Sequence, residues 1–289
     1  MANLKEIRIR ISSVESTMQI TSAMKMVSAA KLKRAQDAII QLRPYANKLT
    51  EMLVNLSASL DSGDGNVFSG EREVKNILFV TITSNRGLCG GFNSNIIKRT
   101  CALIKEEYKN CNASIISIGK KSSEYFSKNG FNVISTHDDL YNEITFEGVS
   151  EIAESLMNDF TKVKYDKVFL VYNQFKNAAT QIIMTENYLP VETPEDESVT
   201  IGEYIFEPSK AEIVQELIPK SLKTQLFKAI LDSHAAEHGA RMTAMHKATD
   251  NANDLKDDLT LFYNKARQAA ITGEILEIGG GAEALKDEK

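Results

Sequence analysis

Residues 4–43 read LKEIRIRISSVESTMQITSAMKMVSAAKLKRAQDAIIQLR, and this stretch decides the fold. A heptad whose first core position is Leu4 continues without a slip to Leu60, and fourteen of its seventeen core positions are apolar. This spacing predicts a long helix with one apolar seam that needs a partner helix. The core positions are Leu4, Ile7, Ile11, Val14, Met18, Thr21, Lys25, Ser28, Leu32, Ala35, Ile39, Leu42, Ala46, Leu49, Leu53, Leu56 and Leu60.

The seam has one polar interruption and one expected break. Thr21, Lys25 and Ser28 are three consecutive core positions, and we expect the seam to loosen there. Pro44 lacks a backbone N–H, so we expect the helix to kink or break near Arg43.

The C-terminal end of the chain carries a second seam. Its apolar positions are three and four residues apart, with no Pro after Pro219 and no Gly between Gly239 and Gly273. The run Gly279–Gly281 is expected to end this helix near Ile278. The predicted seam positions are Met245, Ala248, Ala252, Leu255, Leu259, Phe262, Ala266 and Ala269.

The lengths of the two terminal helices exclude a compact packing of both. At 1.5 Å per residue, about 43 residues of the first helix span roughly 65 Å and the second spans roughly 100 Å. A compact chain of 289 residues has a radius of gyration of only about 19 Å. We therefore expect the two helices to project and to pair with each other as a long antiparallel coiled coil.

The middle of the chain predicts an α/β domain. Residues 76–83 form a β-branched run typical of a buried strand, and a Gly-rich loop at 84–93 follows. Strand and helix patterns then alternate, which favours a mostly parallel, doubly wound, Rossmann-like sheet. Further strands are expected at 114–118, 131–135, 167–172 and 181–185, and helices at 94–108, 122–129 and 149–163. The expected division is an N-terminal helix at 1–60, a linker at 61–74, the α/β domain at 75–208 and a C-terminal helix at 209–289.

Composition and charge narrow the class of protein. Lys and Arg number 34 against 39 Asp and Glu, a net charge of −5, so a generally basic nucleic-acid binder is excluded. No apolar run of about 20 residues is present, and residues 1–10 do not resemble a secretory signal, so we expect no insertion into a membrane. The three cysteines are odd in number, which makes a disulfide framework unfavourable and a reducing compartment the default.

The Gly-rich loop Gly87–Gly91 follows the first predicted strand, where phosphates often bind. It matches neither Gly-x-Gly-x-x-Gly nor Gly-x4-Gly-Lys-Ser/Thr, so we expect a tight structural or contact loop instead. Cys89 lies in this loop, and no His is near it in sequence to activate it as a nucleophile.

The segment His234-Ala-Ala-Glu-His238 matches the His-x-x-Glu-His pattern of some zinc proteases. Two His side chains four residues apart on a helix could hold Zn²⁺, with Glu237 as the base. Because this helix is expected to project, we interpret the segment as an exposed helix face. No cofactor or metal is expected, and the chain does not read as an enzyme acting alone.

Three motifs together resemble one family. They are residues 20–32, ITSAMKMVSAAKL; residues 86–93, RGLCGGFN; and residues 263–282, YNKARQAAITGEILEIGGGA. The chain resembles the γ subunits of F-type ATP synthases in the same order from Asn3 to Ala282. The resemblance implies a non-catalytic rotor shaft that couples proton or sodium flow through the membrane c-ring to ATP synthesis or hydrolysis.

The resemblance also implies partners and a location. The helix pair would turn inside a ring of three α and three β subunits, and the Rossmann-like domain would touch the ε subunit and the c-ring. The chain would be a peripheral protein on the cytoplasmic face of a bacterial inner membrane. A coiled-coil scaffold of another assembly and a zinc hydrolase remain as alternatives.

Roles of single residues are implied in the same way. Met24 and Lys25 would face the moving lever of a β subunit, where Lys25 would meet acidic groups, and Arg241 would lie in the coupling region of the shaft. The remaining expected contact residues fall into three groups: Arg267, Gln268, Thr272 and Glu274 at the ring, Arg86 and Cys89 in a loop near its lower rim, and Tyr204 and Glu207 toward the c-ring. Asn85 departs from the Asp that many relatives have before Arg-Gly, so no salt bridge is expected from it.

Overall fold

The computed structural model describes residues 4–57, 68, 72–141, 143–191 and 210–287. The chain divides into two compact units, which we call the helical unit (residues 1–27 and 242–289) and the sheet unit (residues 28–241). Two helices contribute to both units: α1 (Leu4–Ser57) and α5 (Lys210–Asp287). Most of the expected linker at 61–74, namely residues 61–67 and 69–71, lies outside the described residues.

Both terminal helices are longer than their sequence signals predicted. Helix α1 continues through Pro44 to Ser57, so the break expected near Arg43 is wrong. A proline inside a helix costs about 3 kcal/mol, and the buried side chains of Ala46 and Leu49 in the following turns offset that cost. Helix α5 likewise continues through Gly279–Gly281 to Asp287. Glycine lowers helix propensity by about 1 kcal/mol per residue but permits helical dihedral angles.

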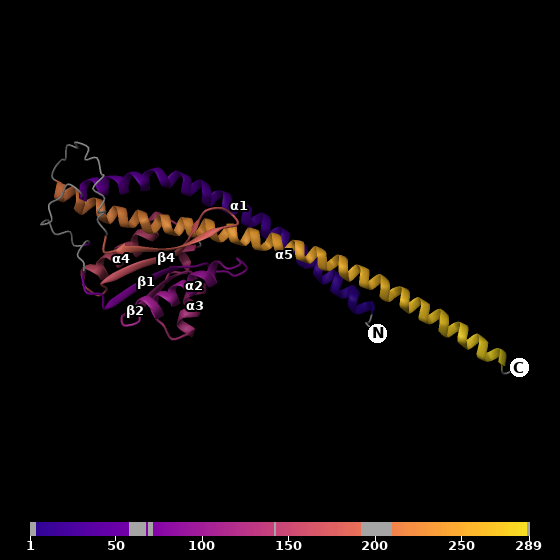
Figure 1. Ribbon diagram of the computed structural model, residues 1–289. Coiled ribbons are helices and arrows are strands. Elements are labelled where there is room, and N and C mark those ends of the chain that lie inside the picture. Colours follow the sequence, from indigo (N-terminus) through magenta and orange to yellow (C-terminus); the bar gives the residue numbers. More distant parts are fainter. Residues whose placement is uncertain (1–3, 58–67, 69–71, 142, 192–209, 288–289) are drawn as a thin grey trace. The chain divides into compact units, whose positions relative to one another are not determined.

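The sheet unit contains one five-stranded sheet with the order β3-β2-β1-β4-β5. Figure 1 labels three of its strands, β2, β1 and β4, which lie side by side. Strands β1 to β4 run parallel to one another, whereas β5 pairs antiparallel to β4 at the edge. The predicted mostly parallel sheet is therefore confirmed. The strands are β1 (Asn76–Ile82), β2 (Asn112–Ile118), β3 (Asn132–Thr136), β4 (Lys167–Phe175) and β5 (Gln181–Leu189).

Helices cover both faces of this sheet. On β1, Ile77 and Phe79 point to one face, and Leu78 and Val80 point to the other, as the two-residue period of a strand requires. The first face packs against α2 (Phe92–Ala102), the π-helical turn η1 (Leu103–Glu107) and α3 (Lys120–Lys128). The second face packs against α4 (Phe146–Thr161) and the part of α5 that belongs to this unit. The doubly wound arrangement is thus confirmed.

The helical unit consists of residues 4–27 of α1 and 242–287 of α5. Four side-chain contacts join the two helices, and as the residue number rises along α1 it falls by an almost equal step along α5. The predicted antiparallel pairing is confirmed. Over the described part of the chain, no helix combines the length and the apolar character needed to cross a bilayer.

Candidate functional site: a helix pair and an anchored loop

Polar contacts fix the register of the helix pair. From the end of the α1 segment nearest the N-terminus, the Arg8 guanidinium donates to the Tyr263 hydroxyl at 2.7 Å, and Lys256 Nζ donates to Glu15 Oε1 at 3.1 Å. The next two contacts join Thr249 Oγ1 to Thr21 Oγ1 at 2.8 Å and Lys25 Nζ to His246 Nδ1 at 3.4 Å. Each contact is satisfied in only one register, so together they oppose sliding of one helix along the other.

The predicted loosening of the α1 seam is not observed. In the helical unit Thr21 is buried and bonded to Thr249, and Lys25 is half-buried. In the sheet unit Ser28 is buried as well. The polar residues are therefore packed into the seam, and Thr21 is satisfied there by a hydroxyl from α5.

The seam predicted on α5 is partly wrong. Leu255 and Phe262 are half-exposed, whereas Lys256 and Tyr263 contact α1. The residues on the two sides of the seam are adjacent in sequence, as Leu255 and Lys256 are. The periodicity rule assigned the apolar residue of each adjacent pair to the seam. Lys256 and Tyr263 face α1 instead, because their side chains bond to Glu15 and Arg8 there. Leu255 and Phe262 are therefore left on the surface.

The predicted ring-contact residues of the helical unit lie on its surface. Met24 is half-buried beside Lys25. The four on α5 are exposed: Arg267, Gln268, Thr272 and Glu274. Arg267 and Glu274 are seven residues apart, which places them on the same side of the helix. Tyr204 and Glu207 lie outside the described residues.

In the sheet unit, the Gly-rich loop is closed by its own side chains. Asn93, in the first turn of α2, accepts from the Ser84 backbone N–H at 2.9 Å and donates to Ser84 Oγ at 2.8 Å. The Phe92 amide donates to the Cys89 carbonyl. The backbone amides of Ser84 and Phe92 are therefore used inside the loop rather than offered to a phosphate. The predicted tight structural loop is confirmed.

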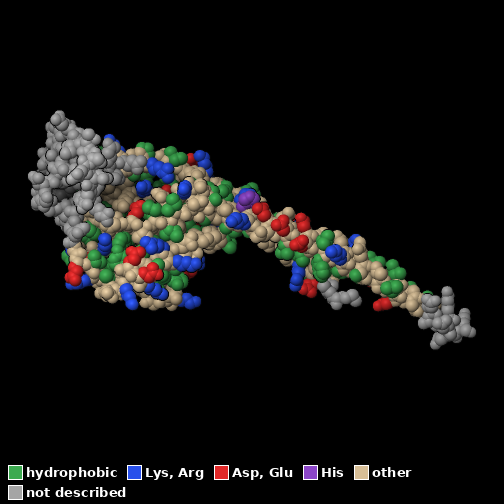
Figure 2. All heavy atoms as spheres, in the orientation of Figure 1, with side chains coloured by type: hydrophobic (Ala, Val, Ile, Leu, Met, Phe, Trp, Pro, Cys, Tyr) green, Lys and Arg blue, Asp and Glu red, His purple; other side chains and the backbone are tan. Residues whose placement is uncertain are grey.

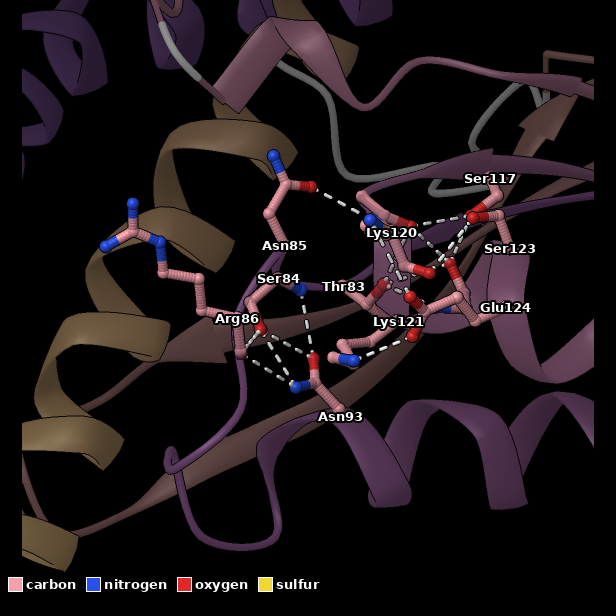
Figure 3. A network of polar contacts seen from close by, with 12 residues as sticks. Thr83, Ser84, Asn85, Arg86, Asn93, Ser117, Lys120, Lys121, Ser123 and Glu124 are labelled. Atoms are coloured by element: carbon pink, nitrogen blue, oxygen red, sulfur yellow. Dashed lines mark hydrogen bonds and ion pairs between the residues drawn. The ribbon is translucent and has the colours of Figure 1, made fainter.

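A second polar network ties this loop to the start of α3 (Figure 3). Asn85 Oδ1 accepts from the Lys120 amide at 2.9 Å, and Asn85 Nδ2 donates to the Asp138 carbonyl at 2.8 Å. An aspartate could not donate the second bond, so the asparagine side chain bridges the first residue of α3 and the loop at Asp138. Thr83 Oγ1 accepts from the Ser122 amide at 3.0 Å. The amides that begin α3 are therefore occupied.

Arg241 anchors the loop from α5. Its guanidinium Nη2 donates to the carbonyl oxygens of Arg86 and Gly87, each at 3.4 Å, and Nη1 contacts Glu237 Oε1 at 2.7 Å. The ion pair is buried, with side-chain exposures of 10% for Arg241 and 7% for Glu237. The Arg86 side chain is exposed, and Cys89 is buried against Phe92 of α2. The structure thus brings together the predicted residues Arg241, Arg86 and Cys89.

A hydrogen-bond chain from Arg241 through His238 to His234 fixes the protonation of the two histidines. Arg241 Nη1 lies 3.4 Å from His238 Nδ1, and His238 Nε2 lies 3.1 Å from His234 Nε2. Because a guanidinium only donates, His238 Nδ1 must accept, and its proton sits on Nε2. That N–H donates to His234 Nε2, so His234 carries its proton on Nδ1. Both rings are neutral in this arrangement.

Burial and the neighbouring cations shift the pKa values of the ionisable groups around Arg241. Burial lowers the pKa of His234 to about 4 and that of His238 to about 3. Burial raises the pKa of Glu237, and Arg241 opposes that rise. Burial also raises the pKa of the Cys89 thiol, so Cys89 is not poised as a nucleophile. The cluster is built to hold the loop, with its ionisable groups paired or neutral.

The interpretation of residues 234–238 as an exposed helix face is wrong. Glu237 and His238 are buried in the sheet unit, because this part of α5 covers the sheet and the loop. The two imidazoles bond to each other, and the Arg241 cation lies beside them. Among the residues that the structure describes, no group of three His, Cys, Asp or Glu side chains could hold a metal ion. Zinc chemistry therefore finds no support.

We expect His238→Gln to alter acid sensitivity without altering stability near neutral pH. Glutamine supplies one acceptor and one donor in place of the two nitrogens of neutral His238. The folded-state pKa of His238 lies below the ordinary 6.5. Its contribution is therefore present above about pH 6.5 and is lost as the pH falls, by about 1.4 kcal/mol per pH unit. Urea unfolding at about pH 7.5 and pH 5 measures the loss in both proteins.

The comparison between the two proteins isolates His238 from its neighbours. Burial raises the pKa of Glu237, which changes stability in the opposite direction but is common to wild type and variant. The wild type should lose more stability than His238→Gln on acidification. Parallel losses in the two proteins would contradict the proposed neutral tautomer.

The sequence analysis did not predict the anchoring role of Glu237 and the histidines. The spacing of Glu237 and Arg241 could have indicated it, since oppositely charged residues four apart on a helix form an ion pair. The closing role of Asn93 had no comparable signal, because it depends on the loop folding back onto Ser84.

Comparison with known proteins agrees with this architecture. A family described as ATP synthase matches residues 3–285. The ATP synthase gamma chain of Christiangramia forsetii is 60% identical over 285 residues, covering 99% of each chain. The gamma chain of Flavobacterium johnsoniae is 61% identical over 289 residues, also covering 99% of each chain.

Solved structures show the same fold. The rotor of the Euglena gracilis mitochondrial ATP synthase matches with a TM-score of 0.67 at 20% identity, covering 93% of this chain and 98% of that one. The central stalk and c-ring structure of the Tetrahymena thermophila enzyme matches with a TM-score of 0.60 at 25% identity, covering 79% and 99%. With an antiparallel helix pair, a Rossmann-like sheet and relatives matched over their whole length, the chain belongs to the ATP synthase gamma chain family.

Proposed function

We propose that this chain is the central shaft of an F-type ATP synthase, which turns inside a ring of three α and three β subunits. It would couple ion flow through a membrane c-ring to the synthesis or hydrolysis of ATP. Membership of the ATP synthase gamma chain family supports this proposal. The antiparallel helix pair supplies the stiffness that a shaft needs.

One observation carries the proposal beyond family membership. Near its C-terminal end α5 exposes Ile275 at 64%, Leu276 at 70% and Ile278 at 73%. Figure 2 shows apolar side chains beside acidic ones on the surface of the helical unit. Apolar side chains gathered on an exposed helix mark a protein-binding surface. A surrounding ring of subunits is the partner that such a helix fits.

The mechanism follows from symmetry. Three equivalent catalytic sites would surround one shaft that has no threefold symmetry, so each β subunit would meet a different side of it. Different contacts stabilise different β-subunit conformations, and rotation exchanges them by shifting populations. The shaft itself would not be catalytic. The titratable cluster of the sheet unit is buried and internally bonded, which supports a structural role for it.

Roles of single residues are part of the proposal. Met24 and Lys25 would face the β-subunit lever, and Arg241 with its loop would serve coupling. The exposed Arg267, Gln268, Thr272 and Glu274 would contact the ring. The sheet unit would meet the ε subunit and the c-ring, with Tyr204 and Glu207 on that side. The chain would lie on the cytoplasmic face of a bacterial inner membrane, and its division at 60, 74 and 208 stays a prediction.

Reconstitution tests the proposal directly. Co-expression with the α and β subunits of the same source should yield one complex that hydrolyses ATP, whereas α and β alone should hydrolyse it much more slowly. A scaffold of another assembly would not co-purify with α and β. Stoichiometric zinc in the purified chain would instead revive the hydrolase alternative.

We expect Lys25→Glu to alter coupling in the reconstituted complex. The change reverses a charge that would meet acidic groups of the β-subunit lever, and like charges in contact are repulsive. ATP-driven ion pumping and ATP hydrolysis should no longer keep the wild-type ratio. Lys33→Glu is the matched control, since Lys33 is an exposed cation of α1 that pairs with Asp37 one turn further along the same helix. Wild-type torque and turnover in Lys25→Glu would refute the assigned role of Lys25.

A further inference from the structure

Three buried oxygen atoms of the sheet unit lack a hydrogen-bond partner among the residues that the structure describes. They are Glu237 Oε2 and Ser233 Oγ on α5, and Tyr141 Oη at the end of the short 3-10 helix η2 (Asp139–Tyr141). Ser233 is 0% exposed and Glu237 is 6% exposed. Buried polar atoms in native proteins nearly always have a partner, so these three oxygens point to a molecule that they bind together.

The three oxygens belong to one place in the fold. Ser233 and Glu237 are four residues apart, which puts them on the same face of α5. The Tyr141 ring lies 6.0 Å from the ring of His234, the residue next to Ser233. Burial raises the pKa of Tyr141, the Glu237 carboxylate raises it further and the Ser233 hydroxyl lowers it. The Tyr141 hydroxyl is therefore close to both, and we call these three residues the Tyr141 site.

The hydroxyl of Ser233 differs from the other hydroxyls of α5. Those of Thr224, Thr249 and Thr260 each donate to the backbone carbonyl four residues earlier, which is the common partner inside a helix. Ser233 makes no such bond. Glu237 likewise uses only Oε1 for Arg241. One hydroxyl and one carboxylate oxygen of α5 are thus left for a further partner.

The charge around the Tyr141 site decides which kind of molecule fits. Arg241 lies 2.7 Å from Glu237 and neutralises its carboxylate, while His234 and His238 are neutral in their hydrogen-bond chain. A cation at the site would meet the Arg241 guanidinium with no unpaired negative charge to hold it. A neutral molecule that both donates and accepts suits a carboxylate oxygen and two hydroxyls. Water has this chemistry.

We propose that Tyr141, Ser233 and Glu237 bind one buried water molecule, which joins η2 to α5. Three protein partners are the usual number for a buried water. The water donates to Glu237 Oε2 and bonds to the two hydroxyls. It holds the carboxylate in place while Oε1 binds Arg241, so the Tyr141 site positions the side chain that anchors the Gly-rich loop. The site lies within the sheet unit and needs no partner subunit.

A high-resolution crystal structure of the full-length chain tests the site directly. We expect one ordered water within about 2.6–3.2 Å of Tyr141 Oη, Ser233 Oγ and Glu237 Oε2. Soaking the crystals in thallium(I) distinguishes a water from a monovalent cation, since only a cation site would give an anomalous peak. A thallium peak at the site would overturn the proposal. A direct bond from the Tyr141 hydroxyl to Glu237, with no solvent density between them, would overturn it as well.

Urea unfolding of the full-length chain tests the site in solution. Tyr141→Phe and Ser233→Ala each remove one hydroxyl, and each should raise the unfolding equilibrium constant about fivefold, the usual worth of one hydrogen bond. Because both hydroxyls bond to the same water, the double variant should raise it only about fivefold to tenfold, whereas two independent losses would multiply to about 25-fold. The independent result would contradict a shared water.

Tyr188→Phe is the matched control for this comparison. The Tyr188 hydroxyl is also buried, but it donates directly to the Leu222 carbonyl at 3.1 Å. Leu222 lies eleven residues before Ser233, which is roughly 16 Å along α5 and beyond the distance at which substitutions usually interact. The effects of Tyr188→Phe and Ser233→Ala should therefore multiply. Non-additivity as large as that between Tyr141 and Ser233 would count against the shared water.

Discussion

Replacing Gly119 with alanine is expected to unfold the sheet unit. Gly119 precedes α3 with φ +101°, and a Cβ built on it would lie 2.0 Å from the Thr83 carbonyl oxygen. The obstacle is backbone, so no side-chain rotation relieves it. Thr83 is also bonded to Ile118 and Ser122, which prevents it from moving away. The expected loss is about 4 kcal/mol or more, the range reserved for severe steric damage.

Gly130→Ala is the matched control for this variant. Gly130 also has positive φ, at +76°, but an added Cβ would have no atom within 4 Å. It should lose only about 1 kcal/mol, the cost of the left-handed conformation alone. Urea unfolding followed by circular dichroism compares the two proteins. Equal losses would show that the contact with Thr83 is relieved at little cost.

Removing the charge of Arg241 is the second change with a large expected effect. Arg241→Leu leaves the Glu237 carboxylate buried without its cation and leaves the Arg86 and Gly87 carbonyls without their donor. Breaking one half of a buried ion pair costs about 3–5 kcal/mol. The loop should also open, so that the buried Cys89 reacts faster with a thiol reagent.

The double variant Arg241→Leu with Glu237→Leu separates charge from packing. It removes both ions, and replacing a whole buried pair with apolar side chains is often close to neutral. We expect it to be markedly more stable than Arg241→Leu in urea unfolding. If the single variant proved as stable as the double, the Glu237 carboxylate would not depend on Arg241.

Much of the fold followed from local patterns in the sequence. The strands were predictable because buried parallel strands are continuous apolar runs, as in residues 76–83. The antiparallel helix pair was predictable because the two seams are long and belong to one chain. The continuation of the helices through Pro44 and Gly279 was not predictable, since propensity rules treat these residues as terminators. At Pro44 the buried residues that follow it offset the cost of the proline.

The candidate site was less predictable, for a physical reason. Whether Lys256 or Leu255 faces α1 depends on which partner the other helix offers, and one helix alone does not contain that information. The same holds for His234 and His238, whose spacing suggested a metal. Their neighbour Arg241 makes them a hydrogen-bond chain instead, and only the folded arrangement reveals it.

The hydrogen-bond chain from Arg241 through His238 to His234 also constrains which substitutions this protein can accept in evolution. Each member has a single proton arrangement that suits the next, so one replacement leaves its neighbour without a buried partner. Only substitutes with the same pattern of donor and acceptor, such as glutamine at 238, are tolerated singly. Arg241 and His234 should therefore be substituted together or stay unchanged. An alignment of homologues would show this as covariation of these positions.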